Sequence, residues 1–255
     1  YALAKQHCLW IVDDAAHALG TVYTDSDNRS FPIGSNAFSD VTIFSFHPVK
    51  TIATGEGGAI STNVPEIAKR MRFFRGHGMV REASEWLERD QGVDIHENIN
   101  PWYYEMQGLG YNYRISDINC ALGLSQLEKL ALFKAHKQRL VHSYDKAFQQ
   151  NFYLTVLKKL NASDTSWHLY TLFIDFEKLG KTRAQFMKAL SSAGVGTQVH
   201  YIPVYKQPYY QQQYGSISLP GAEAYYAQCL SLPLSAGLKA EQQNRVIEQV
   251  LELCA

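Results

Sequence analysis

Apolar and polar positions along the first third of the chain predict three short strands. Residues 8–12 form a continuous apolar run, C-L-W-I-V, and a second apolar-rich segment covers 41–46. The run at 8–12 is typical of a strand buried on both faces of a mostly parallel sheet, and the segment at 41–46 predicts the next strand. A third strand is expected at 59–62, directly after a glycine-rich turn.

A helical period replaces these runs in the middle of the chain. One helix is expected at 65–74, where Asn63 and Glu66 form a capping-box pattern. Residues 79–104 show no clear period and predict an excursion over the surface. The longest helical pattern begins at Ser116, a suitable N-cap, and continues to residue 148.

The last hundred residues alternate between strand and helix patterns, which indicates a smaller α/β domain. The expected elements are strands at 169–176 and 195–201 and helices at 182–193, 220–229 and 239–253. The predicted fold class is therefore α/β. Residues 1–115 would form part of a large domain, 116–148 a long connecting helix, and 149–255 a small C-terminal domain.

The chain opens on Tyr1, its first methionine is Met71, and the pattern enters a core strand almost at once. We therefore expect the N-terminal portion of the large domain to be absent. The remaining piece would expose apolar surface and associate readily.

Composition excludes several function classes. The 255 residues contain 24 Lys+Arg and 24 Asp+Glu, which gives no electrostatic reason to expect nucleic-acid or anionic-membrane binding. No apolar run approaches the length of a membrane span, and no export leader is evident. Four cysteines without a C-x-x-C pair and nine histidines without metal-ligand spacing favour reduced thiols and no metal site. We expect a soluble, cytoplasmic protein.

Candidate chemistry lies where the first two strands end. Asp13 and Asp14 directly follow the first predicted strand. Ser45 lies near the end of the second predicted strand, and Lys50 lies on the loop after it. Because ligands bind beyond the carboxyl ends of strands in open α/β sheets, a carboxylate and an amine would meet at one crevice. Taken singly, each residue favours a structural reading: Asp14 as a turn cap, Lys50 as a solvated loop residue and Ser45 as a buried strand hydroxyl.

Five motifs in succession extend this picture. They are V-D-D-A-A-H-A-L-G at 12–20, F-S-F-H-P-V-K at 44–50, T-G-E-G-G at 54–58, R-G-H-G at 75–78 and G-Y-N-Y-R at 110–114. Together they resemble the DegT/StrS family of sugar-nucleotide aminotransferases, which are fold type I enzymes that use pyridoxal 5'-phosphate (PLP). The family's phosphate-cradling loop and the aromatic residue stacked on the cofactor ring, which precede these motifs, have no counterpart here.

The resemblance implies a role for each matching residue. Lys50 would bond covalently to PLP and then move protons as the general base, since an amine desolvated in an apolar pocket is a good nucleophile. Asp14 would face the pyridine nitrogen and keep it protonated. His17, where many relatives have glutamine, would contact the ring oxygen, and Ser45 would bind the phosphate.

Two further residues of the last motif complete the implied site. Asn112 would reach into the active site of the neighbouring subunit of a homodimer; from the residues alone it reads as a turn asparagine. Arg114 would receive a substrate carboxylate, although a surface-paired arginine at a helix entry is an equal reading. Glu56 lies among glycines and receives no proton-transfer role.

Within the family, the stretches at 101–106, 110–118 and 197–204 resemble members that aminate C4 of a UDP-linked 4-keto-6-deoxy amino sugar of the pseudaminic acid pathway. An ordinary strand of the small domain is the other reading of 197–204. By the resemblance, the following residues would border the nucleotide sugar: Gln198, His200, Tyr201, Ile202 and Pro203.

The expected function is amino transfer, with glutamate as the donor implied by the family. Two alternatives remain. The chain could be a non-catalytic fragment or paralogue of the family. Even if the family activity holds, we expect residues 1–255 alone to hold PLP weakly and to transfer no amino group. A PLP-dependent sugar dehydratase of the same family would carry histidine in place of the cofactor lysine, and Lys50 argues against it.

Overall fold

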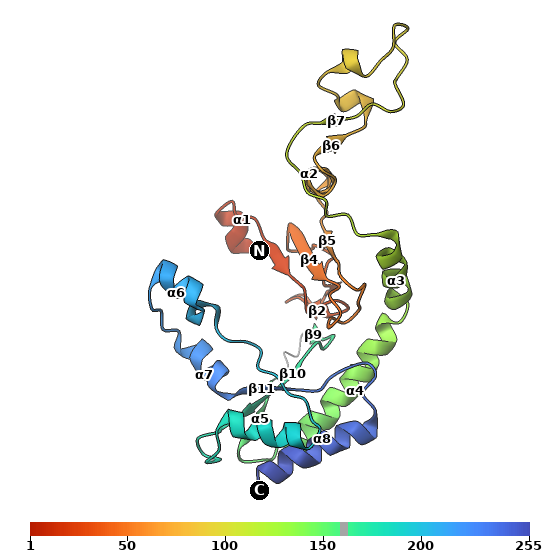
Figure 1. Cartoon of the computed structure of the whole chain (residues 1–255). Helices are drawn as coiled ribbons and strands as arrows, with labels where there is room; N and C mark the ends of the chain where they lie inside the picture. Colours follow the sequence, from red (N-terminus) through yellow and green to blue (C-terminus); the bar gives the residue numbers. More distant parts are fainter. Residues whose placement is uncertain (159–162) are drawn as a thin grey trace. The chain divides into compact units, whose positions relative to one another are not determined.

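A computed structural model describes residues 1–158 and 163–255 (Figure 1). The chain forms two compact units. Unit 1 comprises Tyr1–Leu19 and Phe31–Glu128, and unit 2 comprises Gly20–Ser30 and Lys129–Ala255. The boundary at residue 128 differs from the expected domain limits at 115 and 149, and the segment Gly20–Ser30 belongs with the C-terminal residues.

Unit 1 is built on a three-stranded sheet in the order β1-β4-β5. Strand β1 (Val12–Asp14) runs parallel to β4 (Val41–Ser45), and β5 (Gly58–Ser61) runs antiparallel to β4. The buried residues around this sheet are few and include Ala15, Phe44 and Ile52. The alternation in β4 is regular: Thr42 and Phe44 are buried, whereas Ile43 is exposed.

The expected buried strand at 8–12 is wrong. Helix α1 (Ala2–Gln6) ends just before it, Cys8 has a positive φ of 52°, and pairing begins only at Val12. Leu9, Trp10 and Val12 are 58–71% exposed. An apolar run predicts burial only where another layer covers it, and no described part of unit 1 covers these side chains.

Helix α2 (Pro65–Arg75) follows β5 and carries proline at its first position. The expected capping box at Asn63 is wrong, because Val64 is the N-cap and no side chain caps it. The Asn63 amide donates instead to the carbonyl of Ser35 at 2.8 Å. The Asn63 side chain therefore makes a long-range hydrogen bond and does not cap the helix, as the local sequence had predicted it would.

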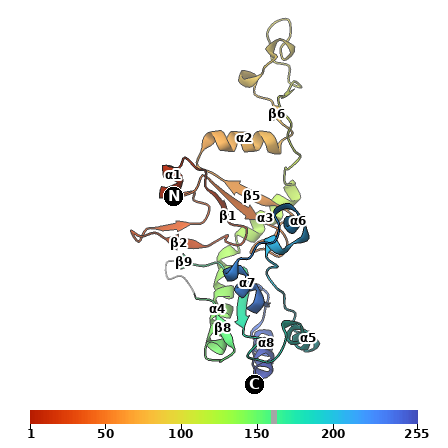
Figure 2. The same cartoon turned by 90° about the vertical axis from the view of Figure 1, so that its left-hand side faces the viewer.

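The excursion after α2 has structure of its own. Short strands β6 (Met79–Val80) and β7 (Glu105–Met106) pair antiparallel at its root, and two 3₁₀ turns, η1 (Ala83–Glu85) and η2 (Arg89–Gln91), lie between them. We call residues 79–106 the lobe. In both views it lies beyond α2, away from β4 and β5 (Figures 1 and 2).

The single long helix expected at 116–148 is wrong. The structure has two helices, α3 (Asp117–Leu127) in unit 1 and α4 (Leu130–Phe148) in unit 2. Glu128 is the C-cap of α3, and Lys129, with φ of −96° and ψ of −2°, is the N-cap of α4. The expected N-cap is confirmed, because the Ser116 hydroxyl accepts from the backbone N–H of Asn119 at 3.2 Å.

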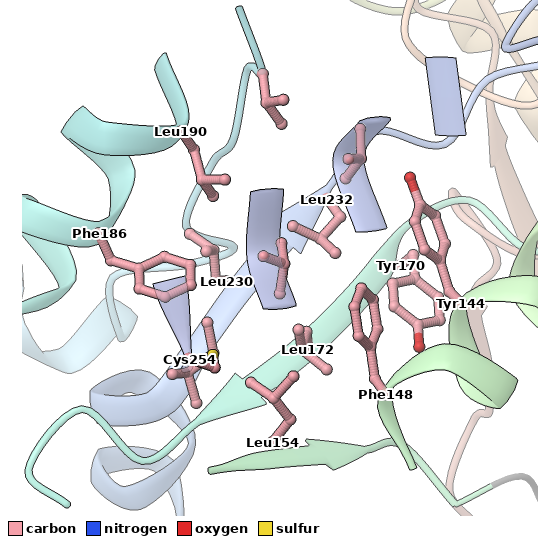
Figure 3. Close-up of a cluster of buried hydrophobic side chains, with 14 of the residues drawn as sticks. Tyr144, Phe148, Leu154, Tyr170, Leu172, Phe186, Leu190, Leu230, Leu232 and Cys254 are labelled. Carbon is pink, nitrogen blue, oxygen red and sulfur yellow. The ribbon is translucent and has the colours of Figure 1, made fainter. Parts of the chain in front are cut away.

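Unit 2 has a three-stranded antiparallel sheet, β8 (Leu154–Val156), β10 (Tyr170–Ile174) and β11 (Cys229–Leu232), with β10 in the centre. Helices α4, α5 (Arg183–Ser192) and α8 (Ala240–Leu253) supply the rest of its core (Figure 3). Tyr144 and Tyr170 pack with ring centroids 4.6 Å apart. A second small pairing joins β2 (Val22–Thr24) to β9 (Ser163–Asp164); β3 (Ser30–Pro32) follows β2 along the chain.

The helix expected at 182–193 is found as α5, where Thr182 and Gln185 form a capping box. The expected strand at 195–201 is wrong, because only Gln198 pairs, in a single bridge to Ser231. The helix expected to reach residue 229 ends at 228 as α7 (Pro220–Gln228), and strand β11 follows at once. Two short elements, η3 (Val204–Lys206) and α6 (Pro208–Tyr214), precede α7.

Within the described residues, no helix has both the length and the apolarity to cross a membrane.

Candidate active site

Asp14 ends β1 beside β4, in register with Ile43. The next residue, Ala15, donates its backbone N–H to the Ile43 carbonyl at 2.9 Å, so the chain turns away just beyond Asp14. Oδ1 of Asp14 accepts from the N–H of Ala16 at 3.1 Å. This single bond fixes the carboxylate and leaves its other oxygen for a ligand. His17 lies half-buried in the same turn.

Ser45 and Lys50 lie on the loop that leaves β4, the strand next to β1. The N–H of Lys50 donates to the His47 carbonyl at 2.9 Å, which closes a tight turn. The Ser45 hydroxyl oxygen receives the N–H of His47 at 3.4 Å, so its own O–H is available to an anion. Because β1 and β4 are parallel neighbours, both strands deliver these side chains to one edge of the sheet.

The glycine-rich turn at residues 54–58 follows the loop that carries Lys50, and hydrogen bonds to the Glu56 carbonyl oxygen fix it. That oxygen accepts from the Thr54 hydroxyl at 2.7 Å and from the Asn119 amide at 3.1 Å. The Glu56 carboxylate lies 3.8 Å from the His47 ring, and both side chains are largely exposed. The backbone of Glu56 therefore shapes the loop that carries Lys50, while its carboxylate remains at the surface.

Gly57 is required by this turn. Its φ is +153°, and a Cβ there would lie 2.5 Å from the Thr54 hydroxyl and 2.9 Å from Cδ1 of Ile115. We expect Gly57→Ala to destabilise the protein by about 1–3 kcal/mol in denaturant unfolding. Gly221→Ala is the control, because that helical position has open space. Equal stability of the two variants would contradict this account.

The R-G-H-G and G-Y-N-Y-R motifs lie against each other. Gly76 and Asn112 form an antiparallel bridge, and the N–H of His77 donates to the Tyr111 carbonyl at 3.0 Å. A Cβ on Gly78 would collide with the Gly108 carbonyl. These glycines thus allow two backbone segments to meet closely, and the exposed side chain of Asn112 projects from the pair.

Arg114 lines a hollow of about 530 Å³ together with Arg72, Gly76, Met79 and Arg81. The sequence did not indicate Arg72 and Arg81, since they come from α2 and from the lobe and belong to no local pattern. Their only advance signal was the close spacing of arginines around the R-G-H-G motif. Three guanidinium groups around one hollow make it suited to anionic groups.

The other predicted residues lie in unit 2. Gln198 exchanges both backbone hydrogen bonds with Ser231, and His200 Nδ1 lies 2.8 Å from the Ser231 hydroxyl. Tyr201 and Ile202 are 59% and 49% exposed. This segment therefore presents a fixed histidine followed by exposed side chains, and Pro203 then precedes η3.

The three groups at the edge of the unit 1 sheet have distinct chemistries: a carboxylate, a hydroxyl and a primary amine. They suit a molecule with a basic ring nitrogen, an anionic group and an aldehyde, in that order. Among the described residues, no cluster of three or more histidine, cysteine, aspartate or glutamate side chains could hold a metal ion.

Comparisons with known proteins agree with this chemistry. Residues 1–251 match the DegT/DnrJ/EryC1/StrS aminotransferase family. The chain is 36% identical to the spore coat polysaccharide biosynthesis protein SpsC of Bacillus subtilis, over 99% of this chain and 61% of that protein. It is also 36% identical to the UDP-4-amino-4,6-dideoxy-N-acetyl-beta-L-altrosamine transaminase of Campylobacter jejuni, over 91% of this chain and 55% of that protein. The chain thus spans about three fifths of the length of these relatives.

Solved structures give the same result. PseC of Helicobacter pylori, described as an aminotransferase in the biosynthesis of pseudoaminic acid, superposes with a TM-score of 0.83 at 32% identity, over 99% of this chain and 61% of that one. The PLP-form of the putative sugar aminotransferase Spr1654 of Streptococcus pneumoniae gives 0.79 at 26% identity, over 96% and 58%. The expected α/β fold of fold type I aminotransferases is therefore confirmed.

Proposed function

The chain belongs to the DegT/DnrJ/EryC1/StrS aminotransferase family, and on that premise we propose that the protein transfers an amino group from glutamate to C4 of a UDP-linked 4-keto-6-deoxy amino sugar. The observation that supports the proposal is the parallel pairing of β1 with β4, because Asp14 ends β1 while Ser45 ends β4 and Lys50 lies on the loop that follows. The names of the Campylobacter and Helicobacter relatives support the choice of sugar.

PLP is the cofactor of the proposal, and when bound it supplies an electron-accepting pyridinium ring. Asp14 would hold the proton on the ring nitrogen, because its carboxylate retains a free oxygen after binding the N–H of Ala16. His17, one turn further along, would contact the ring oxygen. The Ser45 hydroxyl would donate to the phosphate, since its O–H is not used within the loop.

Lys50 would carry out the proton transfers of both half-reactions. Its amine would take the proton from Cα of glutamate in the first half-reaction and would deliver a proton to C4 of the sugar in the second. Over both half-reactions, the nitrogen of glutamate replaces the keto oxygen of the sugar. The water lost from C4 of the sugar balances the water that supplies the keto oxygen of 2-oxoglutarate. The Lys50 side chain is half-buried on a loop that a hydrogen bond to His47 keeps short.

Substrate recognition would use the remaining residues that the family resemblance indicated. Arg114 would bind a carboxylate of glutamate through its bidentate guanidinium fork. The nucleotide sugar would contact Gln198, His200, Tyr201, Ile202 and Pro203, where exposed side chains follow a fixed histidine. We place the reaction in the cytoplasm. The four cysteines, all within described residues, are free thiols, which suits a reducing compartment.

The direct test supplies the purified full-length protein with PLP, glutamate and a UDP-linked 4-keto-6-deoxy-N-acetylhexosamine. We expect equimolar formation of 2-oxoglutarate and a 4-amino sugar nucleotide, followed by mass spectrometry. Release of water from the sugar without nitrogen gain would indicate the dehydratase alternative. Absence of either product with a fully loaded cofactor would contradict an enzymatic role.

A shared site predicts complementation between inactive subunits. In the proposed homodimer, Asn112 of one subunit would serve the cofactor and substrate bound to Lys50 of the other. When Asn112→Ala subunits are mixed with Lys50→Ala subunits, one of the two sites in each mixed dimer contains both Asn112 and Lys50. Each mixed dimer should therefore have up to half of the activity of a parent dimer. The assay needs subunit exchange, which differently tagged chains can verify by co-purification. Verified mixed dimers without activity would contradict the shared site.

A further inference from the structure

Three arginines line the hollow at the C-terminal end of α2. Arg72 comes from α2, Arg81 follows β6, and Arg114 precedes α3. Gly76 and Met79 complete the lining, and the hollow has a volume of about 530 Å³. This volume falls within the range of roughly 300–1,000 Å³ that is usual for small-molecule sites. The hollow therefore has room for a molecule larger than a single ion.

The three guanidinium groups have no acidic partner in the described part of the chain. No carboxylate there lies within 4 Å of any of them. Arg81 lies over the ring of Tyr104, 5.9 Å from its centroid. Like charges around one hollow repel each other, and an anion bound between them relieves that repulsion. This arrangement of arginines therefore favours an anionic ligand.

Backbone pairing fixes the segments that carry these arginines. The N–H of Tyr113 donates to the Arg75 carbonyl at 3.1 Å, so the segment before Arg114 is bonded to the end of α2. Arg81 directly follows β6, which pairs with β7. The backbone around the hollow is therefore set before a ligand binds, which lowers the entropy cost of binding.

The hollow adjoins a residue of the proposed active site. Gly76 lines the hollow and forms an antiparallel bridge with Asn112, which the proposed function assigns to the cofactor and substrate. Arg114, two residues after Asn112, lines the hollow as well. The anionic ligand of the hollow is therefore to be sought among the proposed substrates.

The two proposed substrates offer different anions. Glutamate has two carboxylates but also an ammonium group, which three guanidinium groups would repel. A nucleotide sugar has a diphosphate bridge with two negative charges and four terminal oxygens, and it carries no cation. Guanidinium groups bind phosphate oxygens in a bidentate manner, so three of them can donate to all four oxygens. The charge and the number of donors therefore match the diphosphate better than glutamate.

We infer that the hollow lined by Arg72, Arg81 and Arg114 binds the diphosphate bridge of the nucleotide sugar. Arg72 and Arg81 would serve this substrate alone. Arg114 would serve both substrates in turn, because glutamate leaves as 2-oxoglutarate before the nucleotide sugar binds in a ping-pong reaction. The inference rests on the proposed function and deepens it, since it names two residues outside the five motifs that would recognise a nucleoside diphosphate.

Binding of UDP to the full-length protein tests the inference without turnover. The double variant carries Arg72→Gln and Arg81→Gln. We expect it to bind UDP about tenfold more weakly than the parent, or weaker still, because two charge-assisted contacts are lost. Arg70→Gln is the matched control, since Arg70 is exposed on α2 and is not among the lining residues. Isothermal titration calorimetry measures all three proteins, and circular dichroism verifies that each retains the fold.

A comparison with UMP locates the contact on the diphosphate. The parent should bind UDP more tightly than UMP, because UMP lacks the second phosphate, and the double variant should lose most of this difference. Added salt should weaken the binding of UDP by the parent more than by the double variant. In the aminotransfer assay, the double variant should raise KM for the nucleotide sugar and leave KM for glutamate unchanged.

Several results would overturn the inference: a parent protein that does not bind UDP, equal binding by the parent and the double variant, or an equal loss for UMP and UDP. A higher KM for glutamate with an unchanged KM for the nucleotide sugar would also overturn it, because the hollow would then be a carboxylate site. Binding of UDP requires neither PLP nor glutamate, so failure of this test is distinguishable from failure of the aminotransfer assay.

Discussion

Lys50→Ala should abolish the covalent attachment of PLP and lower amino transfer by on the order of ten-thousandfold, because one amine supplies both the bond and the proton transfers. Non-covalent PLP binding should remain, since Asp14 and Ser45 lie on separate positions of the sheet edge. Borohydride reduction of the parent protein, followed by peptide mapping, should place the cofactor on Lys50.

Lys69→Ala is the control for this experiment. Lys69 is the next lysine along the chain, lies on α2 and pairs with Glu85 at 2.7 Å. Its removal should leave the labelled peptide unchanged. Label on Lys69, or on any lysine other than Lys50, would refute the assignment of the cofactor lysine.

Asp14→Asn should preserve the fold and lower amino transfer by about a hundredfold or more. The amide oxygen can still accept the N–H of Ala16, so the turn after β1 keeps its hydrogen bond. A neutral amide cannot stabilise a protonated ring nitrogen, and the electron-accepting power of the cofactor falls accordingly. Turnover with saturating PLP measures the loss.

Asp13→Asn is the matched control, because adjacent strand residues point to opposite faces of the sheet. Asp13 is exposed and in register with Thr42, one position before Asp14. Its substitution should leave turnover within a few-fold of the parent. If the two variants behaved alike, or if only the variant at Asp13 were impaired, the assignment of Asp14 to the ring nitrogen would be wrong.

Local sequence signals predicted those elements that local interactions decide. The expected cap at Ser116 requires only a hydroxyl and a backbone N–H three residues later. The strand expected at 41–46 is found as β4 (Val41–Ser45), although its alternating burial was not predicted. These features would form in many tertiary contexts, and the pattern alone therefore suffices.

Errors arose where distant residues decided the outcome. Asn63 has the chemistry of a cap but bonds to Ser35, 28 residues earlier. Residues 195–201 have the composition of a strand, yet only one position meets a partner in β11. A pattern records what a segment can do, whereas the available partners determine what it does.

The candidate site also contains residues that the sequence predicted and residues that it did not. Asp14 and Lys50 follow strand ends, so topology predicts their meeting once the strands are recognised. Arg72 and Arg81 were not predictable, because α2 and the root of the lobe bring them to Arg114 only after folding. Roles at the ring and at the phosphate come from the family resemblance and await the variants described above.

The path of the chain between units restricts how this protein can be divided. Residues 20–30 leave unit 1 and return to it, so one cut cannot release unit 2 intact. A fragment starting at Lys129 would lose the Thr21 hydroxyl that accepts from the N–H of Ser166 at 2.9 Å and the Gly20 carbonyl bound by Lys134 at 2.8 Å. It would also leave β9 without β2. Chimeras that exchange unit 2 among relatives must therefore transplant residues 20–30 together with the C-terminal residues.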